Sequence, residues 1–223
     1  EVHVDELDIL GESPQDYPLQ KKGHSMEFLR EIGHLRPRTN SFGAVFRLRN
    51  VLANETHKFF QNKGFIWAHT PIISASDCEG AGEMFTVTNF DMENMPRDEK
   101  GKIDYKQDFF GKQARLSVSG QLQAEFMAMS MGDVYTFGPT FRAENSNTSR
   151  HLAEFWMVEP EMAFADLDDD QDLAEAYLKH MCAEAVKQCP DELDFFHKMM
   201  KSISPEEIQA IAESTFTRIT YTE

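Results

Sequence analysis

The chain has 223 residues and a mass of 25.6 kDa, so it has room for one large domain or two small ones and for a sizeable core. Hydrophobic residues make up 41% and charged residues 27% of it, which excludes a collagen-like, disulfide-scaffold or fully disordered chain. The net charge of −16 argues against nucleic-acid binding driven by overall charge.

The chain begins with a polar, irregular stretch, residues 1–38, which we interpret as a connector that enters a domain. Between residues 21 and 63 basic side chains far outnumber acidic ones. Such a charge pattern fits either a solvated helix face or a surface that meets phosphates. The basic residues are Lys21, Lys22, Arg30, Arg36, Arg38, Arg47, Arg49, Lys58 and Lys63.

A long helix is predicted next, because apolar residues from Phe42 to Phe60 recur at steps of three and four. The polar residues at 39–41 offer N-cap side chains, and Gly64 is well placed to end the helix. A short strand, residues 65–70, follows and is closed by a proline.

The middle of the chain alternates short elements with loops. Residues 74–82 are predicted to be a loop, and residues 84–90 a strand. A charged stretch with glycine and proline, residues 91–112, is interpreted as a surface insertion. Residues 115–119 are predicted to form a strand, and residues 121–131 a methionine-rich helix.

Two alternating runs, residues 134–144 and 154–164, are joined by a polar loop and predict an antiparallel hairpin. Helical patterns follow at residues 166–187 and 191–214. Together these elements predict an α/β fold of the α+β type, with a mainly antiparallel sheet and flanking helices. A doubly wound sheet is not expected, because the longest strand pair is a hairpin.

The hairpin carries the side chains with the clearest chemical potential. Arg142 and Glu144 share one face of its first strand, and Phe155 on the returning strand is positioned beside them. An inward-facing guanidinium needs a partner or an anionic ligand, and its fork matches a phosphate or carboxylate. Phe155 offers a ring for a nucleobase, while Arg150 and His151 add positive charge. The spacing also allows a simpler arrangement, in which Arg142 pairs with Glu144 and Phe155 fills the core.

These residues resemble a known family. Residues 141–144, a loop, and then His151, Phe155 and Glu159 resemble motif 2 of the class II aminoacyl-tRNA synthetases. Residues 63–73 resemble motif 1, the helix–strand–proline element of their dimer interface. Within the class, three segments resemble the aspartyl/asparaginyl branch: Ser76–Phe85, Ser119–Leu122 and Phe137–Thr148. The resemblance runs from about Tyr17 to the last residue.

In this family an amino-acid carboxylate attacks the α-phosphate of ATP, and the resulting aminoacyl-adenylate passes its aminoacyl group to the tRNA. The resemblance implies that Arg142 is catalytic, because it would bridge the carboxylate and the α-phosphate. It implies that six residues bind ATP: Arg142, Glu144, Arg150, His151, Leu152 and Phe155. Four residues are implied on the amino-acid side: Glu79, Gln121, Glu125 and Arg142.

The residues after Gln121 indicate which amino acid is used. Aspartate enzymes of this branch typically carry a lysine three positions after the matching glutamine, where this chain has Ala124, followed by Glu125. A carboxylate accepts a hydrogen bond from a neutral amide and repels an anionic aspartate. The resemblance therefore implies asparagine and its tRNA as substrates. Glu125 could instead be an ordinary exposed helix residue.

The resemblance also implies how the whole protein is organised. Residues 1–38 would connect a preceding anticodon-binding barrel to residues 39–223, the N-terminal part of the catalytic domain. Motif 1 implies a homodimer, and the reaction implies ATP with magnesium. Motif 3 and the magnesium ligand are not recognisable here, so we assign no metal ligand and expect both in a C-terminal continuation. On that reading, the 223 residues alone would be inactive.

The three cysteines, Cys78, Cys182 and Cys189, show no CxxC or Cys/His ligand spacing, so neither a disulfide framework nor a zinc site is predicted. No apolar run reaches the ~18 residues of a membrane span, and no signal peptide opens the chain. We therefore expect a cytoplasmic protein without a membrane partner.

Two alternatives stay open. An aspartyl-tRNA synthetase, or a synthetase-like asparagine synthetase, would use the same chemistry. A synthetase-fold binding module without catalysis would instead use the basic N-terminal face for RNA or a protein partner. The set of Arg142, Glu144 and Phe155 distinguishes the two classes, because a module without catalysis has little reason to retain it.

Overall fold

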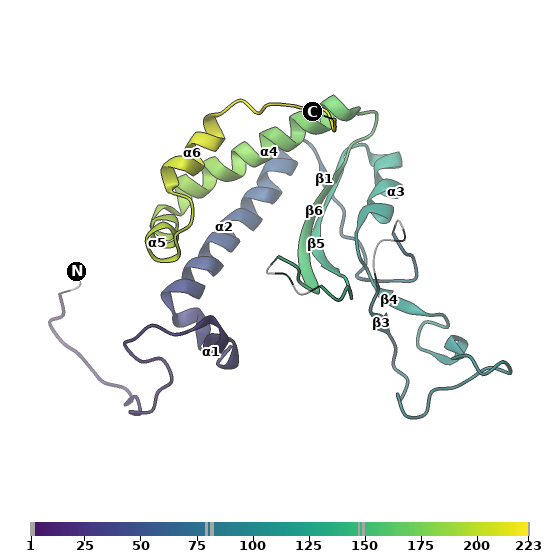
Figure 1. Ribbon diagram of the computed structural model, residues 1–223, viewed down its shortest axis with the longest axis horizontal. Coiled ribbons are helices and arrows are strands. Elements are labelled where there is room, and N and C mark those ends of the chain that lie inside the picture. Colours follow the sequence, from purple (N-terminus) through teal and green to yellow (C-terminus); the bar gives the residue numbers. More distant parts are fainter. Residues whose placement is uncertain (1–2, 79, 81–82, 147, 149, 223) are drawn as a thin grey trace. The chain divides into compact units, whose positions relative to one another are not determined.

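The computed structural model describes residues 3–78, 80, 83–146, 148 and 150–222 (Figure 1). The chain divides into two compact units. One unit consists of Glu1–Glu55 together with Lys179–Glu223, and the other of Thr56–Leu178. Helices α2 and α4 contribute residues to both units.

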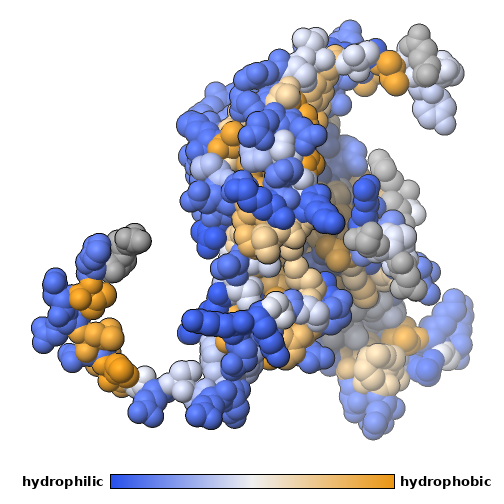
Figure 2. Space-filling view, turned by 60° about the vertical axis from the view of Figure 1, so that its left-hand side comes forward, coloured by the Kyte–Doolittle hydropathy of each residue, from blue (hydrophilic) through white to orange (hydrophobic). Residues whose placement is uncertain are grey.

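The first unit is helical in its described part. Its N-terminal segment carries exposed apolar side chains, which Figure 2 shows in orange: Val4, Leu7, Ile9 and Leu10. The stretch expected to be irregular contains helix α1 (Met26–Glu31) and a 3₁₀ helix (Arg36–Arg38). Helix α1 begins where the Ser25 side chain accepts a hydrogen bond from Phe28 N at 3.2 Å, and it buries Leu29. The prediction of an irregular stretch is therefore wrong at these two helices.

The two long helices have the expected start and stop signals. Helix α2 (Asn40–Asn62) follows Thr39, whose hydroxyl accepts a hydrogen bond from Phe42 N at 3.3 Å. It ends before Gly64, whose φ of +89° is a conformation that glycine adopts without strain. Helix α4 (Leu167–Gln188) has three aspartates in its first turn and a lysine in its last, as the helix dipole favours.

Two shorter helices complete the C-terminal part. Helix α5 spans Pro190–Met200, and helix α6 spans Pro205–Glu213. At the start of α6 the side chains of Ser204 and Glu207 each bond the other's backbone N–H, a capping box. The predicted helical stretch over 191–214 is therefore two helices.

The second unit is built on a three-stranded sheet in the order β1-β5-β6. Strand β1 (Ile66–Trp67) is parallel to β5 (Val134–Phe141), which forms the predicted antiparallel hairpin with β6 (Glu154–Glu161). A smaller antiparallel sheet has the order β2-β4-β3, with strands at Ile73–Ser74, Ala114–Leu116 and Thr86–Val87. The predicted fold class is confirmed.

The hairpin register decides which side chains share a face. Thr136 lies opposite Glu159, and Thr140 lies opposite Phe155. Because side chains alternate along a strand, these four share the face that carries helix α3 (Gln121–Met131), beside the hairpin in Figure 1. On this side Ala124 is fully buried against Ala68 and Val134.

The opposite face of the hairpin packs into an aromatic core. Phe60 of α2 stacks on Tyr135 of β5 with ring centroids 4.7 Å apart, and neither side chain is more than 1% exposed. Leu173 of α4 and Phe59 close the cluster. Burial of each such side chain stabilises the fold by roughly 1.5–3 kcal/mol. This core therefore holds the hairpin in place on the face opposite helix α3.

Residues 91–112 lie at the surface, as predicted. They contain a bridge between Arg97 and Ile103 and a 3₁₀ helix at Tyr105–Gln107. The side chain of Asp98 holds the intervening turn by accepting two backbone N–H bonds, each at 2.9 Å. Phe109 is 75% exposed in this segment.

Candidate active site

A cavity of 360 Å³ lies where the hairpin strands end and the polar loop begins. All six residues that the resemblance implied for ATP line it, together with Ser146 and Ala153. The six are Arg142, Glu144, Arg150, His151, Leu152 and Phe155. They come together because they lie on the last residues of β5, the first of β6 and the loop between them.

Arg142 is the central cation of this cavity. Its backbone N donates to the carbonyl oxygen of Ala153 at 3.0 Å, which continues the hairpin beyond β5. The guanidinium carbon lies 5.5 Å from the ring centroid of Phe155, a cation–π contact. Its Nε is buried and has no hydrogen-bond partner among the described residues. A buried N–H without an acceptor is costly, so this position favours an anionic ligand.

The simpler arrangement considered from the sequence is not found. No ion pair joins Arg142 and Glu144, both of which the structure describes, and the Glu144 side chain is exposed. Phe155 is only half-buried and lines the cavity. The guanidinium and the ring are therefore presented to a ligand.

The loop holds its two basic residues by local hydrogen bonds. The hydroxyl of Thr148 bonds to Nδ1 of His151, and the backbone N of Arg150 donates to the same hydroxyl oxygen at 3.4 Å. Cationic side chains thus gather around a cavity in an otherwise acidic chain, which suits a polyphosphate.

Helix α3 carries the residues implied for the amino-acid side. Gln121 Nε2 donates to Glu125 Oε1 at 3.1 Å, and the thiol of Cys78 lies 3.7 Å from Gln121 Oε1. Glu125 is exposed, whereas Ala124 is fully buried. Glu79 lies outside the described residues. Neither Gln121 nor Glu125 lines the cavity around Arg142.

The loop before β3 and the end of the hairpin are joined by a backbone hydrogen bond. Ala143 N donates to the carbonyl oxygen of Glu83 at 2.7 Å. The segment that resembles the family's mobile loop therefore lies directly beside Arg142.

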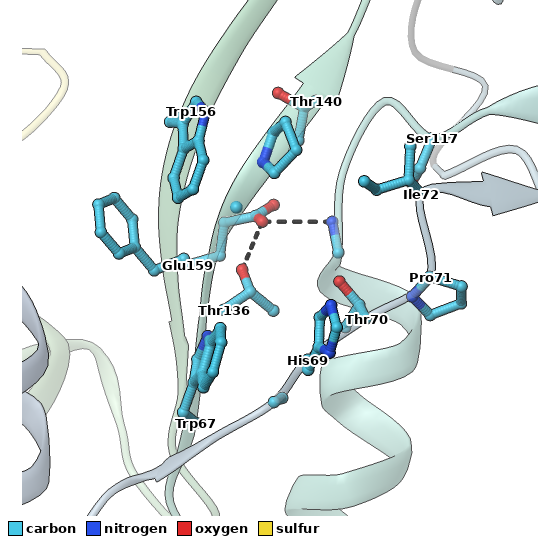
Figure 3. Close-up of a pocket in the computed structure, with 15 residues that line it drawn as sticks. Trp67, His69, Thr70, Pro71, Ile72, Ser117, Thr136, Thr140, Trp156 and Glu159 are labelled. Atoms are coloured by element: carbon cyan, nitrogen blue, oxygen red, sulfur yellow. Dashed lines mark hydrogen bonds between the residues drawn. The ribbon is translucent and has the colours of Figure 1, made fainter. Parts of the chain in front are cut away.

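A buried network at Glu159 was not anticipated from the sequence. Its carboxylate accepts hydrogen bonds from Gly120 N at 3.2 Å, from the Thr136 hydroxyl at 2.6 Å and from the Ser119 hydroxyl. Figure 3 shows the carboxylate between the hairpin and the start of α3. A carboxylate is favourable at a helix N-terminus, so Glu159 fixes α3 to the sheet. The sequence offered one indication of this network, namely the position of Glu159 four residues after Phe155 and on the same face of the strand.

Gly120 makes this close approach possible. A Cβ atom there would lie 2.7 Å from Thr70 Oγ1 and 2.9 Å from Thr136 Cγ2, closer than real Cβ contacts. A second cavity, of 190 Å³, opens beside this junction, and Trp67, His69 and Trp156 stand around it in Figure 3.

Glu161, two residues further along β6, lies in an acidic environment. Burial raises the pKa of its carboxyl group, and the charges of Glu125, Glu159 and Asp170 raise it further. Glu161 therefore lies within the electrostatic reach of three other carboxylates.

No group of three or more His, Cys, Asp or Glu side chains placed to hold a metal ion occurs among the described residues. We therefore assign no magnesium ligand among those residues and derive no step through that ion. None of the helices in the described ranges combines the length and apolarity needed to span a bilayer.

The fold is that of a class II aminoacyl-tRNA synthetase. A family profile described as "tRNA synthetases class II (D, K and N)" matches residues 25–223. The chain therefore belongs to this family.

Curated relatives are similar over the full chain. It is 61% identical to an asparagine–tRNA ligase of Picosynechococcus sp. and 57% identical to one of Clostridium novyi, and all of this chain is covered in both. It covers 49% and 48% of these two proteins, so the chain spans about half the length of the curated relatives it matches.

Solved structures agree with this assignment. Asparaginyl-tRNA synthetase from Pyrococcus horikoshii, complexed with asparaginyl-adenylate, matches with a TM-score of 0.73 and 25% identity over 100% of this chain and 49% of that chain. The Entamoeba histolytica asparaginyl-tRNA synthetase in complex with asparaginyl-adenylate gives a TM-score of 0.66 at 22% identity, over 87% of this chain and 38% of that chain. Because its sequence identity is only 22%, the second match supports the fold and nothing more.

Proposed function

We propose that the protein containing this chain activates asparagine with ATP and transfers it to its tRNA. The single observation that carries the proposal is the cavity in which the Arg142 guanidinium lies over Phe155 with its Nε unpartnered. The asparagine–tRNA ligases at 57–61% identity support the choice of reaction.

The proposed chemistry is mainly charge neutralisation and alignment. A carboxylate must approach the α-phosphate, although both are anions. Arg142 would contact both through its planar fork and would stabilise the negative charge that develops as the new C–O–P linkage forms and pyrophosphate leaves. The adenine ring would stack on Phe155, and Glu144 would accept a hydrogen bond from its amino group. Arg150, His151 and Leu152 would line the phosphates.

We assign selection of the amino acid to the first turns of α3. Glu125 would accept a hydrogen bond from the substrate's side-chain NH₂, and Gln121 would hold the carboxylate of Glu125 in place at 3.1 Å. The buried methyl group of Ala124 supplies no cation for an aspartate side chain. Glu79 is proposed to bind the α-ammonium group, by resemblance alone.

We further propose a homodimer formed through the motif 1 region, in a cytoplasmic protein. Exposed apolar side chains gather there on and after β1, which supports an interface: Ile66, Trp67, Ile72 and Ile73. The three free cysteines suit a reducing compartment. An anticodon-binding barrel before residues 1–38, and magnesium bound elsewhere in the whole protein, remain predictions.

The proposal is tested by ATP–pyrophosphate exchange with the full-length protein. Asparagine, aspartate and lysine are supplied separately, because these are the three amino acids of the family. We expect exchange that depends on asparagine, with kcat/KM at least about 10³-fold higher than for aspartate, since a site built around a hydrogen-bonded group discriminates strongly. Exchange that prefers aspartate or lysine, or no exchange with any of them, would contradict it.

A further inference from the structure

The surface insertion, residues 91–112, carries two adjacent phenylalanines that are exposed to solvent. Phe109 is 75% and Phe110 is 46% exposed, and their rings meet edge to face with centroids 4.9 Å apart. We propose that this aromatic pair, with Lys106 and Lys112 on either side of it in the chain, is a stacking surface for unpaired nucleotides of the tRNA. The inference rests on the proposed function, because it assigns a second contact to a partner of that reaction.

The carboxylates of the insertion hold its own backbone. Four aspartates each accept a hydrogen bond from at least one backbone N–H, at distances of 2.8–3.2 Å: Asp91, Asp98, Asp104 and Asp108. Asp108 is buried and accepts the bond from the backbone N of Phe109 itself, at 2.8 Å. The other two acidic residues, Glu93 and Glu99, lie ten or more positions before Phe109. The aromatic pair is therefore presented by an ordered backbone, which lowers the entropic cost of binding a ligand.

The cations of the insertion are not used in this way. Among the described residues, no carboxylate forms an ion pair with any of the five: Arg97, Lys100, Lys102, Lys106 and Lys112. The two lysines nearest the aromatic pair, Lys106 and Lys112, are both exposed. Proteins bind single-stranded nucleic acid with positive side chains and exposed aromatic rings, because every base has a face that can stack. A purely apolar protein partner would account for the rings but not for the lysines.

The insertion lies within reach of the proposed active site. It leaves the small sheet at β3 and returns at β4, in the same compact unit as the hairpin, as Figure 1 shows. The carbonyl oxygen of Ser117, directly after β4, accepts a hydrogen bond from Phe141 N at 2.9 Å. Phe110 lies seven residues before Ser117, so their Cα atoms are at most about 25 Å apart. An RNA whose end enters the cavity around Arg142 therefore passes within reach of the aromatic pair.

The test uses the full-length protein and a transcript of the asparagine tRNA from the same organism. Phe109→Tyr keeps an aromatic ring, Phe109→Leu keeps an apolar side chain without one, and a double variant, Lys106→Gln with Lys112→Gln, removes both charges. Phe164→Leu, at an exposed phenylalanine outside the insertion, is the matched control. Filter binding gives the dissociation constant for tRNA at several salt concentrations. Thermal unfolding and asparagine-dependent ATP–pyrophosphate exchange are measured for each variant.

We expect Phe109→Leu to bind tRNA about 5- to 150-fold more weakly, the effect of one lost base stack, whereas Phe109→Tyr and Phe164→Leu bind it as the wild type does. The double lysine variant should reduce the slope of log affinity against log salt concentration by about 1.4, because each phosphate contact to a single strand contributes about 0.7. Exchange in the absence of tRNA should be unchanged in every variant.

Equal tRNA affinity in Phe109→Leu and wild type would overturn the inference, as would an unchanged salt dependence in the double lysine variant. A change of oligomeric state in Phe109→Leu without weaker tRNA binding would show that the pair contacts protein, which also contradicts it. Equal losses of exchange and of tRNA affinity would count against it too, because they indicate damage to the whole unit. Failure of the proposed function would instead appear in the wild-type protein, as exchange that does not depend on asparagine.

Discussion

Arg142 combines two properties that rarely occur in one surface side chain. Its Nε is buried without a partner among the described residues, while its guanidinium carbon faces the Phe155 ring at 5.5 Å. An anion in the cavity would satisfy both the unmet hydrogen bond and the positive charge. The guanidinium is therefore held ready for a ligand at a cost that the rest of the fold offsets.

Replacing Arg142 with alanine in the full-length protein should lower kcat/KM for asparagine-dependent exchange by about 10²–10³-fold. This is the effect of removing one preorganised contact to a developing anion, roughly 3 kcal/mol. The kcat/KM of Arg142→Lys should lie between those of the wild type and of Arg142→Ala, because lysine keeps the positive charge but lacks the planar guanidinium fork. Arg97→Ala, in the surface insertion, is the control. A near-wild-type rate for Arg142→Ala would remove Arg142 from its role.

The choice between asparagine and aspartate should depend on two neighbouring residues of α3. The double variant Ala124→Lys with Glu125→Gln introduces a cation and removes the carboxylate that repels an anionic substrate. We expect the ratio of kcat/KM for asparagine over aspartate to fall by at least tenfold in exchange assays. Because Ala124 is fully buried, Glu125→Gln alone is measured as well, and it should lower the ratio in the same direction. An unchanged ratio in both variants would refute the assignment.

Glu161 is expected to make stability depend on pH. Burial first, and then Glu125, Glu159 and Asp170, raise the pKa of its carboxyl group in the folded protein. The folded state therefore binds this proton more tightly than the unfolded state, and stability is lost as pH rises from the ordinary carboxyl value of 4.5 through the raised one.

Glu161→Gln should thus raise the midpoint of thermal unfolding at pH 7–8, and its advantage should shrink as the pH falls through the raised pKa and be lost below about 4.5. Glu99→Gln, at an exposed position of the insertion, controls for removal of one negative charge. If both variants show the same shift at every pH, the raised pKa contributes nothing to stability.

At the scale of elements, the site depends on the junction between the hairpin and α3. Glu159 reaches from β6 to the start of the helix, and Gly120 lets the two approach. Gln121 and Glu125 lie in the first turns of this helix. A displacement of its N-terminus would therefore move both residues proposed to bind the amino acid.

Gly120→Ala tests this junction. A methyl group 2.7 Å from Thr70 Oγ1 forces the helix or the strand to shift, so we expect destabilisation by about 1–3 kcal/mol and a raised KM for asparagine. Gly138→Ala on β5 is the matched control, because a Cβ there meets nothing within 4 Å. Equal melting midpoints for the two variants would show that Gly120 is not constrained by close packing.

Elements with strong periodicity were predictable, whereas helix α1 and the exact bounds of the short strands were not. The hairpin, α3 and the two long helices follow from alternation or from helical spacing in the chain itself. Helix α1 has six residues and depends on one cap and one buried leucine, so it leaves little trace in the sequence. Strands β1 and β3 lie within the strands predicted at residues 65–70 and 84–90, but each pairs over only two residues. Their lengths are set by partner strands that are distant in the chain.

The same distinction applies to the site. The six residues that the resemblance implied for ATP lie on one hairpin. Their spacing in the sequence was therefore enough to predict that they lie close together. The Glu159–Ser119 and Cys78–Gln121 contacts join residues 40 and 43 positions apart. No local pattern predicts such pairs, since they are set by how α3 packs on the sheet.

At the scale of the whole molecule, the chain spans about half the length of the curated relatives it matches, so the reaction is proposed for the protein that contains it. Among the described residues, Arg142, Arg150 and His151 line one cavity at the end of the hairpin. Two arginines and a histidine around one cavity suit a polyphosphate.

The most direct test of this account is the dissociation constant of ATP for the full-length protein, measured by calorimetry for wild type and Phe155→Ala. Stacking of a base on an aromatic ring contributes about 1–3 kcal/mol, so we predict that the variant binds ATP roughly 5- to 150-fold more weakly. Trp156→Phe, next in sequence but on the opposite face of β6, should bind ATP as the wild type does. Equal ATP affinity in Phe155→Ala and wild type would contradict the central claim that this cavity holds the nucleotide.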